Sequence, residues 1–244
     1  MPYFLLLIRS LDLNNLLGQN RVLINSVSIL LFTLSVGTFA AASDEHLETA
    51  TFSTLQIVAK TGSPPAQRIL ASMYEQGDGV ERDIAKAIKW YRSAAELNDD
   101  IAQFYLGYLY YQAIGLEQDY NLAFHWFARA AEQGNADFQY NLGNLHRYGE
   151  GTVVNIDNAL KWYNLAANQD QANAQLDLAH LYLKGEQVTR DLVQAYVWFS
   201  LALEQIDTGQ EIKLLSEKMS AEQLKVARKN VTLWLDKNRG NYEK

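Results

Sequence analysis

Apolar positions in this chain fall on the faces of short helices. In the first such segment the apolar side chains stand three or four residues apart, which is the spacing of one helix face. Gly77 and Gly79 then interrupt the pattern, as expected for a turn that needs positive φ angles. A second segment follows, in which Ala87, Trp90 and Tyr91 share a face. The pattern therefore predicts two helices joined by a glycine turn. The apolar residues of the first helix are Ala66, Ile69, Leu70, Met73 and Tyr74.

The same unit returns every 36 residues, as four tryptophans show: Trp90, Trp126, Trp162 and Trp198. The residue after each tryptophan is aromatic, and columns of leucine, glutamine and small residues keep the same step. So do the predicted helix N-caps, whose side-chain oxygens can accept hydrogen bonds from free backbone N–H groups. Agreement over so many columns indicates an internal repeat. The columns are Tyr91/Phe127/Tyr163/Phe199, Leu70/Leu106/Leu142/Leu178, Gln67/Gln103/Gln139/Gln175, Ala71/Gly107/Gly143/Ala179, Ala87/Ala123/Ala159/Ala195 and the caps Asp83/Asp119/Asn155/Asp191.

This repeat predicts an all-α fold, a right-handed α-solenoid of paired antiparallel helices. A lone helix pair cannot bury its apolar stripe, but stacked pairs can. The small columns let the two helices of a pair approach closely, and each tryptophan with its aromatic neighbour is expected to fill the space between successive pairs. The repeats are predicted at residues 66–101, 102–137, 138–173 and 174–209.

The periodic pattern fades at both ends of the array, as expected for caps. Residues 43–65 predict an N-terminal cap helix. Residues 210–244 predict C-terminal capping helices, one of which opens with Ser220 and Gln223 as a capping box.

Two of the repeats carry a family resemblance. The segments AQRILASMYEQGDGVERDIAKAIKWYRSAAE and FQYNLGNLHRYGEGTVVNIDNALKWYNLAA resemble Sel-1-like repeats (SLR), relatives of the tetratricopeptide repeat. The resemblance covers about residues 66–203, and it implies a bacterial exported adaptor that holds a peptide or protein partner. Ala113 and Gln187 replace turn glycines, so their loops are expected to differ in shape. Some secreted members carry a disulfide in each repeat and have been assigned β-lactamase activity, but this chain has no cysteine.

An uncharged segment at residues 22–43 precedes the repeats. Arg21 stands before it and Asp44 after it, and Ala40-Ala41-Ala42 matches an A-x-A cleavage signal. The segment predicts a signal peptide at residues 1–42 and a periplasmic or secreted protein. The alternative is an uncleaved anchor in the inner membrane with a periplasmic domain, because about 20 apolar residues can span a bilayer.

Charge and motifs exclude several classes of function. The chain has 21 Lys and Arg against 28 Asp and Glu, a net charge of -7, which disfavours binding to nucleic acid. We find no G-x-S-x-G, S-x-x-K, Walker or H-E-x-x-H motif. Together with what the resemblance and the uncharged N-terminal segment imply, these absences favour a non-catalytic protein-interaction scaffold of the bacterial cell envelope, with no catalytic residues, metal or cofactor. The alternative is a cell-envelope hydrolase, either β-lactamase-like or active on the cell wall.

A partner is expected on the concave face, which the first helix of each pair lines in related helical-repeat arrays. Projecting that geometry onto this chain selects an aromatic strip with arginines on either side, and both residue types are common anchors of interfaces. Asn144 could hold a peptide backbone, and Arg147 could bind a carboxylate. The alternative is that the aromatic rings pack between helices as core. The predicted contact residues are Arg68, Phe104, Tyr108, Tyr111, Tyr140, Asn144, Arg147 and His180.

Overall fold

The computed structural model describes residues 51–238, and all regular elements in that range are α-helices. The predicted signal peptide or anchor (1–42), the first part of the predicted N-terminal cap and the last six residues lie outside the described range. No helix between residues 51 and 238 is long and apolar enough to cross a membrane. The helices are α5 (Phe52–Lys60), α6 (Pro64–Gln76), α7 (Ile84–Glu96), α8 (Asp100–Gln112), α9 (Tyr120–Glu132), α10 (Ala136–Tyr148), α11 (Ile156–Ala167), α12 (Ala172–Lys184), α13 (Leu192–Ala202), α14 (Gly209–Lys218) and α15 (Ala221–Asn238).

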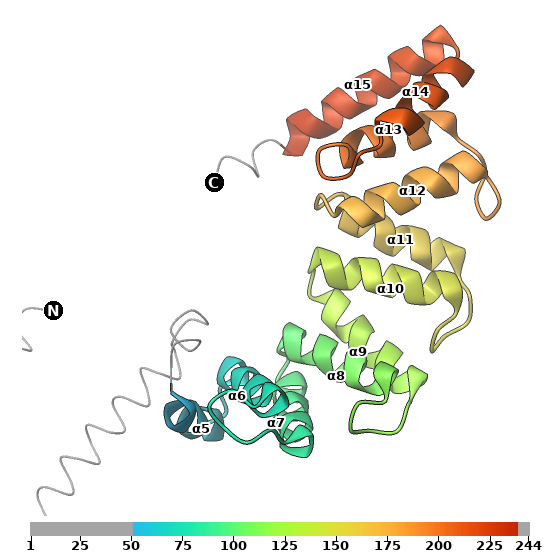
Figure 1. Cartoon of the computed structure of the whole chain (residues 1–244). Coiled ribbons are helices and arrows are strands. Elements are labelled where there is room, and N and C mark those ends of the chain that lie inside the picture. Colours follow the sequence, from blue (N-terminus) through green and yellow to red (C-terminus); the bar gives the residue numbers. More distant parts are fainter. Residues whose placement is uncertain (1–50, 239–244) are drawn as a thin grey trace, which may run out of the picture.

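The helices pack as consecutive pairs, α6 with α7, α8 with α9, α10 with α11 and α12 with α13, and each pair also packs against the next. Figure 1 shows the pairs following one another along a curved row, from α5 at its lower end to α15 at its upper end. This arrangement confirms the prediction of an all-α solenoid built from a 36-residue unit.

The first helix of each pair begins two residues before the predicted repeat boundary, as α6 illustrates. Pro64 and Pro65 occupy its first turn, where the backbone N–H groups have no partner within the helix. In the next repeat, Asp99 caps α8 by accepting a hydrogen bond from the N–H of Ala102.

The predicted N-caps and turns are found at the second helices. Asp83, Asp119, Asn155 and Asp191 each accept a hydrogen bond from a backbone N–H in the first turn of α7, α9, α11 and α13. Ala113 adopts the left-handed conformation of its glycine equivalents, with φ 58° against 78° at Gly77, so the expected difference in shape does not occur at this residue. Gln187 does differ from its equivalents. Gly79, Gly115 and Gly151 have positive φ angles, and Gln187 does not.

The most deeply buried ring of each pair is the residue after the tryptophan. Tyr91, Phe127, Tyr163 and Phe199 are at most 7% exposed. Trp90, Trp126 and Trp162 are only partly buried, and of the four equivalent tryptophans Trp198 alone reaches the core. The tryptophans nevertheless pack against the core, Trp90 and Trp126 against the cluster of residues 55–109 and Trp162 against the cluster that joins α9 to α10. One residue along a helix turns the side chain by about 100°, which moves the next ring fully inward.

The small columns do bring the helices of a pair close together. A Cβ atom at Gly143 would lie 2.7 Å from the Tyr163 ring, and one at Gly107 would lie 3.0 Å from the Phe127 ring. These glycines leave room for the buried rings, as the spacing predicted.

A buried glutamine in each first helix joins it to the preceding helix. Its Nε2 donates to the carbonyl oxygen of the alanine eight residues earlier. In two repeats a second glutamine completes the contact, since Gln133 donates to Gln103 Oε1 at 2.9 Å and Gln169 donates to Gln139 Oε1 at 2.8 Å. The pairs are Gln67 with Ala59, Gln103 with Ala95, Gln139 with Ala131 and Gln175 with Ala167.

Leu97→Gln is expected to raise the free energy of unfolding by about 1 kcal/mol. Leu97 is half exposed and stands where the next repeat has Gln133, while Oε1 of the buried Gln67 has no hydrogen-bond partner within residues 51–238. A glutamine at this position can donate to Gln67 as Gln133 donates to Gln103. Urea denaturation followed by circular dichroism measures the change. The control is Leu97→Asn, whose amide is one methylene too short; an equal gain from both variants would attribute the effect to loss of an exposed leucine.

The last helix, α15, covers the end of the array. Its capping box is confirmed, since the Gln223 N–H donates to Ser220 Oγ and the Ser220 N–H donates to Gln223 Oε1. Ala227 is fully buried against the last core cluster, and Trp234 Nε1 donates to Asn168 Oδ1 at 3.1 Å. This contact places α15 across the fourth pair and beside the end of the third.

Candidate binding surface on the first helices

The predicted contact residues all lie on α6, α8, α10 and α12, whose solvent-facing sides are here called the first-helix face. Tyr108 is 40% exposed, and the other seven are partly buried. The residues do not form one continuous strip. They divide into a central group on α8 and α10, Tyr140 and Arg147 bound to Asp177, Arg68 bound to Asp99, and His180, whose ring meets the Phe199 ring edge-on at 5.1 Å.

The central group surrounds a cavity between α8 and α10, here called the central notch, with a volume of about 240 Å³. It brings together four predicted residues, Phe104, Tyr108, Tyr111 and Asn144. Projection along the first helices missed the rest of the lining. Phe127 comes from a second helix and Glu150 from the turn after α10. The additional lining residues are Gln112, Phe127, Asn141, Leu145 and Glu150.

The rings of the central notch differ in how firmly the fold holds them. Phe104 stacks on Phe138 with ring centroids 4.5 Å apart and also contacts Phe127 at 5.1 Å, so it is part of the packing between repeats. Tyr108 has no such ring contact among the described residues and points its exposed surface to solvent. The aromatic strip therefore contains both kinds of residue that the sequence allowed. Phe104 packs between helices, and Tyr108 lies on the open surface.

A hydroxyl–carboxylate pair crosses the rim of the central notch. The Tyr111 hydroxyl donates to Glu150 Oε2 at 2.8 Å. This hydrogen bond, together with burial and the negative charge of Glu150, raises the pKa of Tyr111 to about 12. The tyrosine thus stays protonated at physiological pH and orients the carboxylate.

The two predicted arginines already have carboxylate partners within the chain. Arg147 Nη1 lies 2.9 Å from Asp177 Oδ1, and Arg68 Nε lies 3.2 Å from Asp99 Oδ2. Tyr140 also donates to Asp177, at 3.0 Å, and burial raises the pKa of this tyrosine. Arg147 was predicted to bind a carboxylate of the partner. In the structure the carboxylate of Asp177, on α12, takes that place.

Asn144 lines the central notch, and its amide also contacts tyrosines of the fold. Its Oδ1 accepts a hydrogen bond from the buried Tyr163 hydroxyl at 2.6 Å. Burial raises the pKa of Tyr163, so the hydroxyl remains a donor. Because Oδ1 is held in this way, the Nδ2 donor of Asn144 is turned away from Tyr163, and the amide also acts on the Tyr140 hydroxyl.

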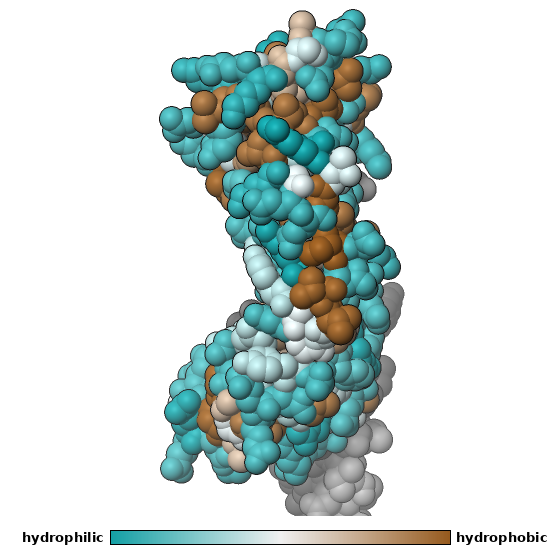
Figure 2. All heavy atoms as spheres, turned by 90° about the vertical axis from the view of Figure 1, so that its right-hand side faces the viewer, coloured by the Kyte–Doolittle hydropathy of each residue, from teal (hydrophilic) through white to brown (hydrophobic). Residues whose placement is uncertain are grey.

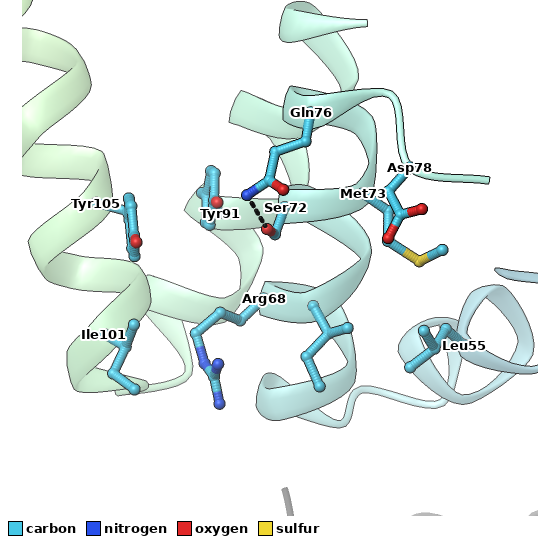
Figure 3. Close-up of a pocket in the computed structure, with 10 residues that line it drawn as sticks. Leu55, Arg68, Ser72, Met73, Gln76, Asp78, Tyr91, Ile101 and Tyr105 are labelled. Carbon is cyan, nitrogen blue, oxygen red and sulfur yellow. Dashed lines mark hydrogen bonds between the residues drawn. The ribbon is translucent and has the colours of Figure 1, made fainter. Parts of the chain in front are cut away.

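A second cavity, of about 350 Å³, lies over α6 between α5 and α8 (Figure 3). Several of its polar side chains are engaged within the fold. Gln76 Nε2 donates to Ser72 Oγ at 3.2 Å, and Tyr91 donates to Glu75 while stacking on Tyr105 at 5.4 Å. The cavity is therefore a less open recognition surface than its size suggests.

Apolar surface also gathers on the side of the molecule with the turns after the first helices. Figure 2 shows a strip of apolar residues at the middle of the stack on this side and a second area toward the C-terminal helices. The turn after α10 contains Val153 and Val154, which are 79% and 59% exposed. In the first repeat the equivalent residues are Glu81 and Arg82, so this apolar turn is particular to the third repeat.

Residues 51–238 hold no group of three His, Cys, Asp or Glu side chains placed to bind a metal ion. What they do hold is a stack of similar helix pairs with a side-chain-lined notch on one face. Such a stack defines a helical-repeat protein of the α-solenoid class.

The family model for the Sel1 repeat matches residues 64–99, 100–135, 136–171 and 172–207. The chain therefore belongs to the Sel1 repeat family. Each matched segment begins at the first residue of α6, α8, α10 or α12. Sel1 repeat proteins are generally protein-interaction scaffolds.

Two of the solved structures that are similar to this chain have sequence identities of 30% or more. One is c5321, a protective antigen present in uropathogenic Escherichia coli strains that displays an SLR fold, with 32% identity and a TM-score of 0.64 over 76% of this chain and 40% of that chain. The other is a Sel1 repeat protein from Oxalobacter formigenes, with 30% identity and a TM-score of 0.59 over 78% of each chain. The chain thus spans less than half the length of the Escherichia coli protein. No curated protein matches it.

Proposed function

We propose that this protein is a non-catalytic scaffold of the bacterial cell envelope, and that its first-helix face forms the concave surface on which a partner protein binds. The observation that carries the proposal is the central notch. It combines an exposed ring at Tyr108, a packed ring at Phe104 and a carboxylate at Glu150, which is the mixture of anchor and polar rim found in protein interfaces. The envelope location rests on the uncharged segment at residues 22–43 and its A-x-A signal.

A photo-crosslinking amino acid at Tyr108 is expected to capture a defined partner in intact cells. The matched control is the same amino acid at Leu165 on α11, because this residue has nearly the same exposure, 41% against 40%. Adducts are detected by gel shift and identified by mass spectrometry. Equal labelling at both positions, or none at Tyr108, would contradict the proposal. So would turnover of a cell-wall or β-lactam substrate that one point substitution abolishes.

A further inference from the structure

We infer that the central notch receives a lysine or arginine side chain from the partner segment. This inference rests on the proposed function and specifies the chemistry that the first-helix face recognises. Three observations support it: the charge of the repeats, the pairing of their arginines, and the position of Glu150 beside the aromatic rings.

The repeats form a negatively charged surface. Residues 64–207 contain 19 Asp and Glu but only 10 Lys and Arg, and the two middle repeats, residues 100–171, contain eight and three. One of those three cations, Arg147, is already paired with Asp177. A surface of this sign attracts a basic segment and repels an acidic one.

Glu150 supplies a carboxylate at the central notch itself. Its Oε2 accepts a hydrogen bond from Tyr111, which fixes its orientation. Within residues 51–238 no lysine, arginine or histidine lies at ion-pair distance from it. An acidic or purely apolar side chain entering the notch would take water away from this carboxylate without replacing it, which costs free energy. A cationic side chain would compensate the charge.

The other walls suit the stem of a basic side chain. Lysine and arginine carry long apolar stems that pack on apolar surface while the charged head reaches a polar partner. The Tyr108 and Phe104 rings offer such a surface, and an aromatic face also attracts a nearby cation. The volume, about 240 Å³, falls below the roughly 300–1,000 Å³ of most small-molecule sites and fits a single side chain better.

The test begins with a random peptide library displayed on phage and selected on the full chain. We expect the enriched sequences to share a lysine or arginine. One such peptide is then synthesised in three forms, with the basic residue kept or replaced by norleucine or glutamate, and binding is measured by fluorescence anisotropy. Norleucine should weaken binding about tenfold, as expected for loss of one charge-assisted hydrogen bond, and glutamate should weaken it further.

Variants of the protein assign the effect to the central notch. Glu150→Gln should weaken the basic peptide about tenfold but should not weaken the norleucine peptide, because only the basic peptide pairs with the carboxylate and a neutral amide costs less to desolvate. The amide oxygen of glutamine can still accept from Tyr111, so the fold is retained, and circular dichroism checks it. Glu186→Gln, at the equivalent turn position in the fourth repeat, should change neither peptide.

The outcomes separate this inference from the proposed function. If peptides bind and compete with photo-crosslinking at Tyr108, yet carry no shared basic residue, the scaffold function stands and the basic anchor is wrong. The same conclusion follows if Glu150→Gln and Glu186→Gln behave alike. If no peptide is enriched and Tyr108 captures no partner, the proposed function fails and the inference fails with it.

Discussion

Tyr163→Ala is expected to lower the free energy of unfolding by about 4 kcal/mol, and Trp162→Ala by less than half as much. Tyr163 has no exposed surface, lies against Gly143, and donates a hydrogen bond to Asn144. Its removal leaves a large cavity between α10 and α11. Trp162 is only partly buried, so solvent can take the place of its ring.

Urea denaturation of the full chain, followed by circular dichroism, measures both changes. Tyr163→Phe serves as the control, because it keeps the ring and removes the hydroxyl; phenylalanine is the natural residue at this position in the second and fourth repeats. We expect a cost of about 1 kcal/mol for this variant. If Trp162→Ala lowers the free energy of unfolding more than Tyr163→Ala does, the indole contributes more to the packing of the repeat than the tyrosine, and the prediction is wrong.

Gly151→Ala is expected to lower the free energy of unfolding by about 3 kcal/mol, through overpacking added to the strain of a left-handed alanine. The glycine has φ +70°, and a Cβ there would overlap the carbonyl oxygen of Tyr120 at the start of α9. Since that atom belongs to the backbone, the clash is relieved only by moving the helix.

A matched control is available at the equivalent turn of the first repeat. Gly79 has φ +66°, but the nearest atom to an added Cβ is the flexible end of Met73, 3.5 Å away. Gly79→Ala should therefore show only the conformational cost, about 1 kcal/mol. Thermal unfolding of both variants measures the difference, and equal shifts would mean that the approach of the turn to α9 has no role.

Much of the fold could be predicted from the sequence because a repeat multiplies weak signals. One turn such as Gly77–Gly79 is ambiguous, but the same turn at 36-residue spacing, with a capping residue such as Asp83 after it, is not. Local chemistry determines these features, since a side-chain cap and a left-handed residue depend on few neighbours. Ala113 shows the limit of this reasoning, because the fold holds it in the glycine conformation.

The candidate site was less predictable. Positions on the first helices followed from helical spacing, so Tyr108 and Asn144 were found. Glu150 was not, because it lies in a turn and reaches the central notch only through the packing of α8 beside α10. The internal pairing of Arg147 with Asp177, 30 residues later, was also beyond a reading of single helices.

The sequence by itself determined the repeat, its paired helices, its caps and the face on which polar and aromatic side chains gather, because each depends on spacing along the chain. Only the tertiary structure decided which aromatic column is buried, which arginines are neutralised, and that Glu150 lies at the notch with no cation at ion-pair distance among residues 51–238. Those properties depend on the distances between neighbouring repeats, and a periodic sequence specifies them only once the pairs have packed.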